Sequence, residues 1–299
     1  MDGEIALPSG RCQAIPAVSG ETGDIAHTLS LYRPVPRGKD YKPATRHGSG
    51  MDRIGLTRWI ALGLILSVWQ LAALRALPEY VLSPLQILRS VVDALGSAEL
   101  YEHIGASLKR SLPGFALGSL LGAALGLAAG VARWFDRMLS PAVFLTYPVP
   151  KIVMLPIFMI WFGIGDLSKV LIIALACFYP VFINAYYGVR QTRTILVWSA
   201  LNMGASQRAI FRRVVLPSAL PMIMASLRVS LALSFIVMFA AEMINARSGL
   251  GHLIRVAENS LRFDLMYVSL VTIGVLGYAG DRLIRHSQAK LLAWREPAP

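Results

Sequence analysis

The chain has 299 residues, of which 55% are hydrophobic and only 15% are charged. Soluble domains are usually about 45–50% apolar and about 25% charged, so this composition argues against a soluble enzyme and predicts a polytopic membrane protein. The 29 lysines and arginines outweigh 17 acidic residues, which gives a net charge of +12, whereas two cysteines, Cys12 and Cys177, are too few for a disulfide framework or a metal site.

The N-terminal segment differs from the rest of the chain. Residues 1–50 are rich in proline and glycine and lack apolar periodicity, so we expect a disordered cytoplasmic extension over residues 1–58. No apolar stretch precedes Trp59, which argues against a secretory signal peptide. Met51 stands directly before a basic stretch and the first apolar run, so it is an alternative start that N-terminal mass spectrometry would test.

Six apolar segments follow, each near the roughly 20 residues that cross a bilayer. They lie at about 59–77, 109–132, 138–163, 168–189, 218–241 and 263–284. The sequence therefore predicts an all-α polytopic membrane protein with a transmembrane domain over 59–286 and a cytoplasmic C-terminal tail over 287–299. Residues 84–98 are amphipathic and are expected to lie along the outer surface, with these side chains on one face: Leu85, Leu88, Val92 and Leu95.

The basic residues predict the orientation through the positive-inside rule. With both termini in the cytoplasm, 19 of the 29 lysines and arginines fall on the inner side, whereas the acidic residues divide almost evenly. The loop over 190–217 between the fourth and fifth spans carries five arginines and no acid. We therefore expect this loop to lie in the cytoplasm.

The 190–217 loop also has a pattern too ordered for a plain connector. Ile195 to Met203 can form a short helix that Gly204 ends in the left-handed conformation. Ser206 can then cap a second helix, whose apolar face and basic face alternate until Leu216-Pro217 ends it. The apolar face is formed by Ile210, Phe211, Val214 and Val215, and the basic face by Arg208, Arg212 and Arg213. Pro221 would stand in the first turn of the fifth span. Such a surface lies on lipid headgroups or docks into a groove of a partner.

This stretch resembles the cytoplasmic coupling loop of ABC-importer permeases, whose pattern is E-A-A, three residues, G, nine residues, I-x-L-P. Gly204, Val214, Leu216 and Pro217 stand at the matching spacings. Four segments resemble the branch that carries nitrate, sulfonate, taurine or bicarbonate: WFGIGDLSKV (161–170), GASQRAIFRRVVLPSALP (204–221), AEM (241–243) and SGLGHLIRVAENSLRFD (248–264). The resemblance covers roughly residues 59–295.

The resemblance implies a type I importer permease with six spans in the bacterial inner membrane. It implies a homodimer, two cytoplasmic ABC ATPases that bind ATP and Mg²⁺, and an extracytoplasmic substrate-binding protein. This chain lacks the G-x-x-x-x-G-K-[ST] phosphate loop, so it should not hydrolyse ATP itself and should bind no cofactor. The residues expected to contact the ATPase are Trp198, Ala200, Gly204, Ala205, Ser206, Arg208, Phe211, Val214, Leu216 and Pro217.

One departure affects the coupling loop. The E-A-A positions of the family hold Trp198, Ser199 and Ala200 in this chain. The missing glutamate removes an anchor for a basic residue of the ATPase, although Trp198 can still pack into an apolar groove. Coupling strength or partner choice is expected to differ, while family membership is not affected.

Glycines recur every four residues along the second span, at Gly114, Gly118, Gly122, Gly126 and Gly130. This stripe favours close helix packing, within the chain or across a dimer, over a role in lining a pore. The third span holds four prolines, Pro141, Pro148, Pro150 and Pro156, and is expected to bend because each proline frees a backbone carbonyl.

Charged residues inside spans mark a transport pathway by default. Lys151 and Arg228 are therefore candidates for contact with an anionic substrate, with snorkelling or an internal ion pair as the alternative. Glu242 and Asn184 are also assigned to this pathway. Glu242 is the natural partner for a basic residue, and Asn184 can hydrogen-bond across helices. No catalytic constellation is visible, and the histidines have no metal-ligand spacing.

The substrate stays open. Sulfonate or taurine is the first choice, nitrate or bicarbonate the next, and a neutral or aromatic organic solute the alternative. An ion-coupled secondary transporter would need inverted repeats with paired broken helices, which the sequence does not show. A membrane-anchored nucleic-acid protein would need a basic soluble domain with interleaved aromatic residues, and none is present, so we expect lipid but no nucleic acid as a partner.

Overall fold

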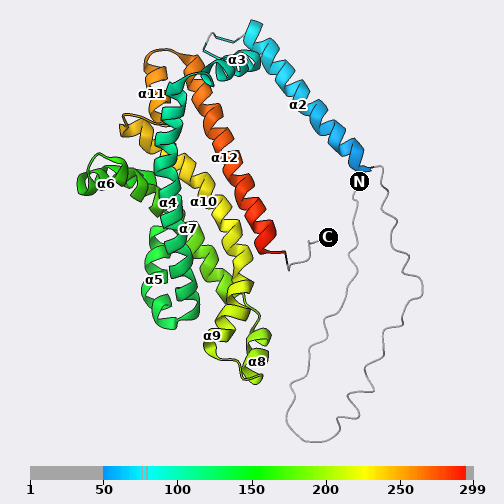
Figure 1. Ribbon diagram of the computed structural model, residues 1–299, viewed down its shortest axis with the longest axis vertical. Coiled ribbons are helices and arrows are strands. Elements are labelled where there is room, and N and C mark those ends of the chain that lie inside the picture. Colours follow the sequence, from blue (N-terminus) through cyan, green and yellow to red (C-terminus); the bar gives the residue numbers. More distant parts are fainter. Residues whose placement is uncertain (1–49, 76, 79, 294–299) are drawn as a thin grey trace, which may run out of the picture. The chain divides into compact units, whose positions relative to one another are not determined.

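The structure is a computed structural model that describes residues 50–75, 77–78 and 80–293 (Figure 1). Every regular element in these residues is helical. The α-helices are α2 (Gly50–Arg75), α3 (Pro84–Ala94), α4 (Ala98–Val131), α5 (Arg133–Thr146), α6 (Leu155–Phe162), α7 (Asp166–Arg190), α8 (Thr194–Asn202), α9 (Gln207–Ile210), α10 (Leu216–Asn245), α11 (Leu250–Asn259) and α12 (Phe263–Leu291). A 3₁₀ turn, η1 (Lys151–Met154), precedes α6, and a π-helical turn, η2 (Phe211–Val215), joins α9 to α10.

Helix ends differ from the predicted domain boundaries at both ends of the chain. Residues 50–58 belong to α2, so this part of the predicted extension is helical, while residues 1–49 lie outside the described residues. At the other end α12 continues to Leu291, past the predicted boundary at 286. A hydropathy pattern locates the apolar part of a helix, whereas backbone hydrogen bonds continue into the polar sequence beside it.

Four helices are long and apolar enough to cross a membrane. They run over Ala98–Val131, Asp166–Arg190, Gln207–Asn245 and Phe263–Leu291, in agreement with the second, fourth, fifth and sixth predicted spans. The first predicted span corresponds to a shorter apolar helix, Trp59–Arg75. Counting the bent pair described next as one span, the described chain has five long apolar spans against the six predicted.

The third predicted span is broken rather than curved. Arg133–Thr146 and Lys151–Phe162 meet at an angle of 96°. Pro148 and Pro150 stand in the break, where each lacks the N–H that a continuous helix would need. The predicted bend is therefore confirmed, and it is sharp enough to direct α6 away from α5.

The glycine stripe packs α4 directly onto α7. A Cβ atom at Gly118 would lie 2.1 Å from the carbonyl oxygen of Ala174, and one at Gly126 would lie 2.4 Å from that of Phe182. The other three stripe glycines also face α7: Gly114 and Gly122 meet backbone carbonyls, and Gly130 meets the Val189 side chain. Packing within the chain, one of the two interpretations offered by the sequence, is confirmed.

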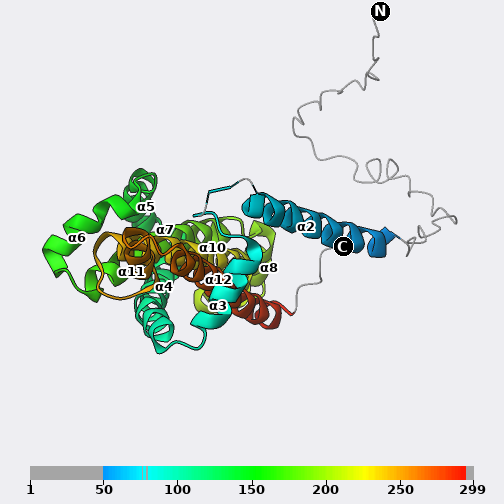
Figure 2. The same cartoon turned by 90° about the horizontal axis from the view of Figure 1, so that it is seen from above.

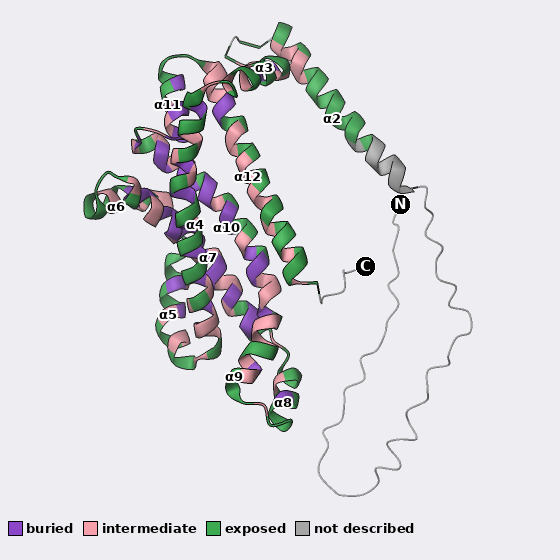
Figure 3. Ribbon diagram, in the orientation of Figure 1, coloured by how far each residue is buried: buried purple, intermediate pink, exposed green. Residues whose placement is uncertain are grey.

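Helix α10 packs on another side of α7, where Gly188 meets Ala219. Apolar side chains of these two helices, with Leu155 of α6, form the largest core cluster, which includes Ile173, Cys177 and Met238. The flank formed by α5 and α6 lies on the side of this core away from α12 (Figures 1 and 2). Few side chains of α12 are buried, as its mostly green and pink ribbon shows (Figure 3).

The amphipathic segment at 84–98 forms α3 as far as Ala94. A reciprocal capping box starts it, in which the Ser83 hydroxyl accepts from the Gln86 N–H and the Gln86 carboxamide accepts from the Ser83 N–H. The predicted apolar face is exposed, while Ile87 is buried beneath it. The helix is thus confirmed, and its place relative to a membrane stays a prediction.

Candidate functional site

The loop over 190–217 folds as two helices joined at a glycine. Helix α8 ends in a Schellman motif, in which the N–H of Ala205 donates to Ala200 O at 3.0 Å and that of Gly204 donates to Leu201 O at 2.9 Å. Gly204 has a φ of +78°, in the left-handed region that favours glycine. The Ser206 hydroxyl then accepts from the Ala209 N–H at 3.3 Å and caps α9. The predicted turn is confirmed at each of these positions.

The second helix does not end at Leu216-Pro217, so that prediction is wrong. The residues from Gln207 to Asn245 form one continuous helical path. In a regular α-helix the ring of Pro217 would meet the carbonyl of Arg213. The π-helical turn η2 contains Arg213 and shifts the hydrogen-bond register there, so the chain passes the proline without a break.

The exposed side of this loop is apolar with a basic margin. We call the exposed apolar side chains of α8 and its end the coupling surface: Ile195, Leu196, Trp198, Leu201 and Met203. Trp198 is 65% exposed, whereas Ala200 is buried. The arginines predicted for the basic face, Arg208, Arg212 and Arg213, are exposed, and the apolar face of the second helix is buried or half-buried, including Phe211, Val214, Leu216 and Pro217.

A cavity of about 540 Å³ separates α8 from the start of α10. Its lining includes Leu196, Ala200, Val214 and Pro217. Within α8, the buried residue is Ala200. Exposed apolar patches of this kind mark surfaces that contact a partner.

Lys151 is engaged by its own backbone. Its ammonium donates to the carbonyls of Thr146, Tyr147 and Val149 at 2.8, 3.0 and 2.5 Å, and lies 4.0 Å from the centre of the Tyr179 ring. All three N–H bonds are therefore used at the break between α5 and η1. This geometry favours a structural role over substrate contact, although Lys151 also borders a cavity of about 380 Å³.

Arg228 and Asn184 also have partners within the chain. The Arg228 Nε donates to Asp281 Oδ1 of α12 at 2.7 Å, and Arg285 pairs with the same carboxylate. The internal ion pair, the alternative for Arg228, is thus present, and the group as a whole keeps one positive charge. The Asn184 amide donates to Pro180 O of its own helix at 2.8 Å, so the predicted bond across helices does not form.

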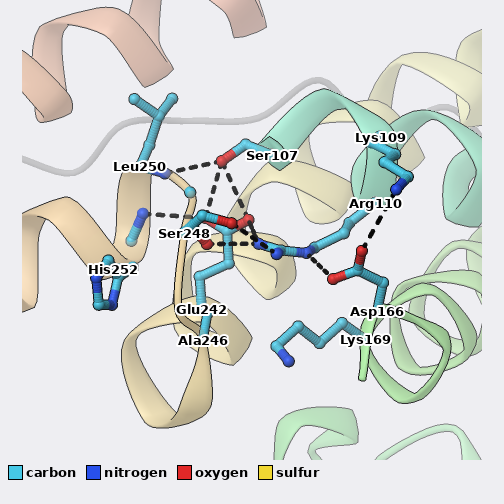
Figure 4. Close-up of polar contacts among 12 residues, drawn as sticks. Ser107, Lys109, Arg110, Asp166, Lys169, Glu242, Ala246, Ser248, Leu250 and His252 are labelled. Carbon is cyan, nitrogen blue, oxygen red and sulfur yellow. Dashed lines mark hydrogen bonds and ion pairs between the residues drawn. The ribbon is translucent and has the colours of Figure 1, made fainter. Parts of the chain in front are cut away.

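A buried network that the sequence did not reveal surrounds Glu242. Figure 4 shows the network, which we call the Arg110 cluster: Ser107, Arg110, Asp166, Glu242 and Ser248. Arg110 joins three helices, because its Nη1 donates to Glu242 Oε1 of α10 at 2.7 Å and its Nε donates to Asp166 Oδ1 of α7 at 2.6 Å. Glu242 is 0% exposed, so Arg110 is the basic partner that its burial requires.

The turn before α11 completes this network. Arg110 Nη1 also donates to Ser248 O at 2.7 Å, and the Gly251 N–H donates to Glu242 Oε2 at 3.0 Å. Gly249 has a φ of +115°, and a Cβ atom there would lie 2.4 Å from the Glu242 carboxylate. Both glycines therefore let the turn approach the carboxylate closely. The AEM and SGLG segments meet at this turn, so their resemblance to the family was the feature of the sequence that pointed to this site.

The cluster and the coupling surface lie at opposite ends of α10. Helix α9 and the start of α10 adjoin α8, whereas Glu242 stands in the last turn of α10 beside α11 (Figure 1). At about 1.5 Å per residue, the path from Gln207 to Asn245 covers the thickness of a bilayer with its headgroups. One end thus carries an exposed apolar surface and the other a buried network of charges.

Comparison with known proteins identifies the family of this chain. The family model described as "Binding-protein-dependent transport system inner membrane component" matches residues 114–292. The chain belongs to this family. It is therefore a multi-pass inner-membrane permease subunit of an ABC importer, and this membership decides against a secondary transporter and against a nucleic-acid protein.

Curated relatives agree over most of the chain. It is similar to a putative aliphatic sulfonates transport permease of Escherichia coli, with 36% identity over 77% of this chain and 88% of the relative. It is also similar to the taurine transport permease of that species, with 33% identity over 78% and 90%. A riboflavin transport permease of Chloroflexus aurantiacus is 34% identical over 78% and 90%.

Among solved structures, a chain of the MetNI methionine ABC transporter in an inward-facing conformation aligns with a TM-score of 0.47 and 21% identity. The alignment covers 68% of this chain and 96% of that chain.

Proposed function

We propose that the coupling surface docks into a cytoplasmic ABC ATPase and transmits its motion to the spans. The exposed apolar side chains of α8, ordered by Gly204 and Ser206, carry the proposal. Aromatic side chains in apolar patches supply much of the energy of protein contacts, and Trp198, 65% exposed, is the aromatic residue of the coupling surface. The exposed arginines beside it suit an acidic rim on the ATPase.

ATP and Mg²⁺ are bound by that partner, since the phosphate-binding loop is absent from this sequence. Two copies of the chain form the permease, and a binding protein delivers the solute on the face opposite the coupling surface. Both termini lie in the cytoplasm, which the distribution of basic residues supports. Movement of α9 passes into α10 without a joint, because the two belong to one continuous helical path.

The proposed solute is a small organic anion, sulfonate or taurine first and nitrate or bicarbonate next. The names of two relatives, one for aliphatic sulfonates and one for taurine, support this class. A neutral aromatic solute is the second candidate, which the riboflavin permease at similar identity supports. Uptake of labelled ethanesulfonate and riboflavin by cells that express the complete transporter separates the two.

Co-purification with the ATPase tests the docking step. Trp198→Ala should weaken retention of the ATPase by about 30-fold or more, as expected for an aromatic residue at the centre of a contact. Trp134→Ala is the matched control, because Trp134 of α5 is 66% exposed, much like Trp198, but lies outside the coupling surface. Equal retention by both variants would contradict the assignment.

A further inference from the structure

Another cavity, of about 700 Å³, lies at the first turn of α7, beside the Arg110 cluster. It is at the end of the molecule away from the coupling surface. The side chains that line it include Arg110, Asp166, Lys169 and Arg247. None of these residues was singled out by the sequence for a role, and the docking function does not use them.

Lys169 is the unusual member of this lining. Lys169 is 2% exposed, and its ammonium makes one hydrogen bond, to Gly165 O at 3.0 Å. Among the described residues no carboxylate oxygen lies within ion-pair distance of it, and Figure 4 draws no contact from Lys169 to Asp166 or Glu242. A buried ammonium with a single neutral acceptor has two further N–H bonds that can donate to a ligand.

The surroundings of Lys169 favour a negative ligand. Helix α7 has 25 residues, and no side chain caps its first N–H groups, so its positive dipole end is open toward Gly165. Arg247 is exposed at the rim. Asp166 also borders the cavity, but its carboxylate is held by Arg110 at 2.6 Å and lies 3.9 Å from Lys109.

The charges around the cavity do not balance. The lining supplies three positive charges, from Arg110, Lys169 and Arg247, and Lys109 beside Asp166 supplies a fourth. Asp166 and Glu242 supply two negative charges, which leaves two positive charges. The space is far larger than one monatomic ion needs, since a water molecule takes up about 30 Å³ of liquid. A ligand with an anionic head and a small body fits both the charge and the volume.

We propose that this cavity binds a small oxyanion from solution, such as a sulfonate, with Lys169 and the first turn of α7 as its donors and Arg247 at its rim. The site goes beyond the coupling function and does not depend on which solute the transporter carries. It gives the permease its own affinity for an anionic group, at the end of the molecule away from the ATPase.

Calorimetric titration of the full chain in phosphatidylcholine nanodiscs tests this. With ethanesulfonate as the probe, at constant chloride concentration and without ATPase or binding protein, we expect saturable binding of one ligand per chain. The neutral analogue ethyl methyl sulfone should not bind. Lys169→Gln should weaken ethanesulfonate binding by about tenfold or more, because a charge-assisted hydrogen bond is lost.

Lys109→Gln is the matched control, since the Lys109 side chain is 77% exposed beside the same Asp166, and it should change binding less than twofold. Arg247→Gln alters an exposed residue, so it keeps the test valid if the Lys169 variant does not fold, and it should weaken binding several-fold. Absence of saturable binding, equal binding of the sulfone, or wild-type affinity in Arg247→Gln would each overturn the proposal. ATPase retention, measured in parallel, reports separately on docking.

Discussion

Replacing Gly118 with alanine should separate α4 from α7. The added Cβ atom would lie 2.1 Å from the carbonyl oxygen of Ala174 and 2.8 Å from its carbonyl carbon, where ordinary contact begins near 3.4 Å. The obstacle is backbone, so no side-chain rotation relieves it. The two helices must move apart by about 1 Å, which weakens the packing along the whole glycine stripe.

Overpacking of this kind costs about 1–3 kcal/mol. For a chain of this size, each kcal/mol lowers the melting temperature by about 2–4 °C, so we expect a decrease of about 2–12 °C. The assay is thermal unfolding of the detergent-purified permease, followed by size-exclusion chromatography of what remains folded after heating.

Gly105→Ala is the control on the same helix, because a Cβ atom there would meet no heavy atom within 4 Å. It should leave the melting temperature unchanged or raise it slightly, since alanine favours a helix over glycine. If Gly118→Ala melts at the wild-type temperature, the close α4–α7 contact inferred from the stripe is wrong.

Three further changes test other parts of the account. Arg110→Met leaves the buried Glu242 without its cation and should lower the free energy of unfolding by about 3–5 kcal/mol, measured by thermal unfolding. Lys109→Gln should change it little, and equal effects of the two variants would refute the stabilising role of the Arg110 cluster. Ser206→Ala removes the cap of α9 and should cost about 1 kcal/mol, seen as faster hydrogen exchange over residues 207–210, and unchanged exchange would argue against the cap. Burial, with Arg255 nearby, lowers the pKa of His252 below its ordinary value of 6.5. The unfolded chain therefore binds a proton that the folded chain does not, and the free energy of unfolding should fall as the pH drops below about 6.5. His252→Gln should reduce this fall, and an unaltered pH profile of the variant would contradict the interpretation.

How much the sequence predicted depends on how local the signal was. The turn at Gly204 and the cap at Ser206 follow from residues within a few positions of each other, and both are confirmed. The glycine stripe was visible because its period matches one helix face. Part of the local bonding of Lys151 could also have been inferred, since Pro150 lacks the N–H that a continuous helix would offer to Thr146 O, one of the carbonyls that the ammonium binds.

The rest could not be predicted from one sequence, because it depends on pairing between distant segments. Arg110 and Glu242 are 132 residues apart, and Arg228 and Asp281 are 53 apart. Nothing in the sequence near Arg110 distinguishes it from any other arginine at the end of a span. The path of the helix through Pro217 was also missed, because a π-helical turn has no reliable sequence signal.

Helix α8 is the proposed point of contact with the ATPase. A photo-cross-linking amino acid at position 198 of the full transporter tests it most directly, with the same amino acid at Trp134 as the control. We expect a cross-link to the ATPase from position 198, with a yield that changes when ATP is added, and little or none from position 134. Cross-links from position 134 alone, or from neither position in a complex that still hydrolyses ATP and transports its solute, would contradict it.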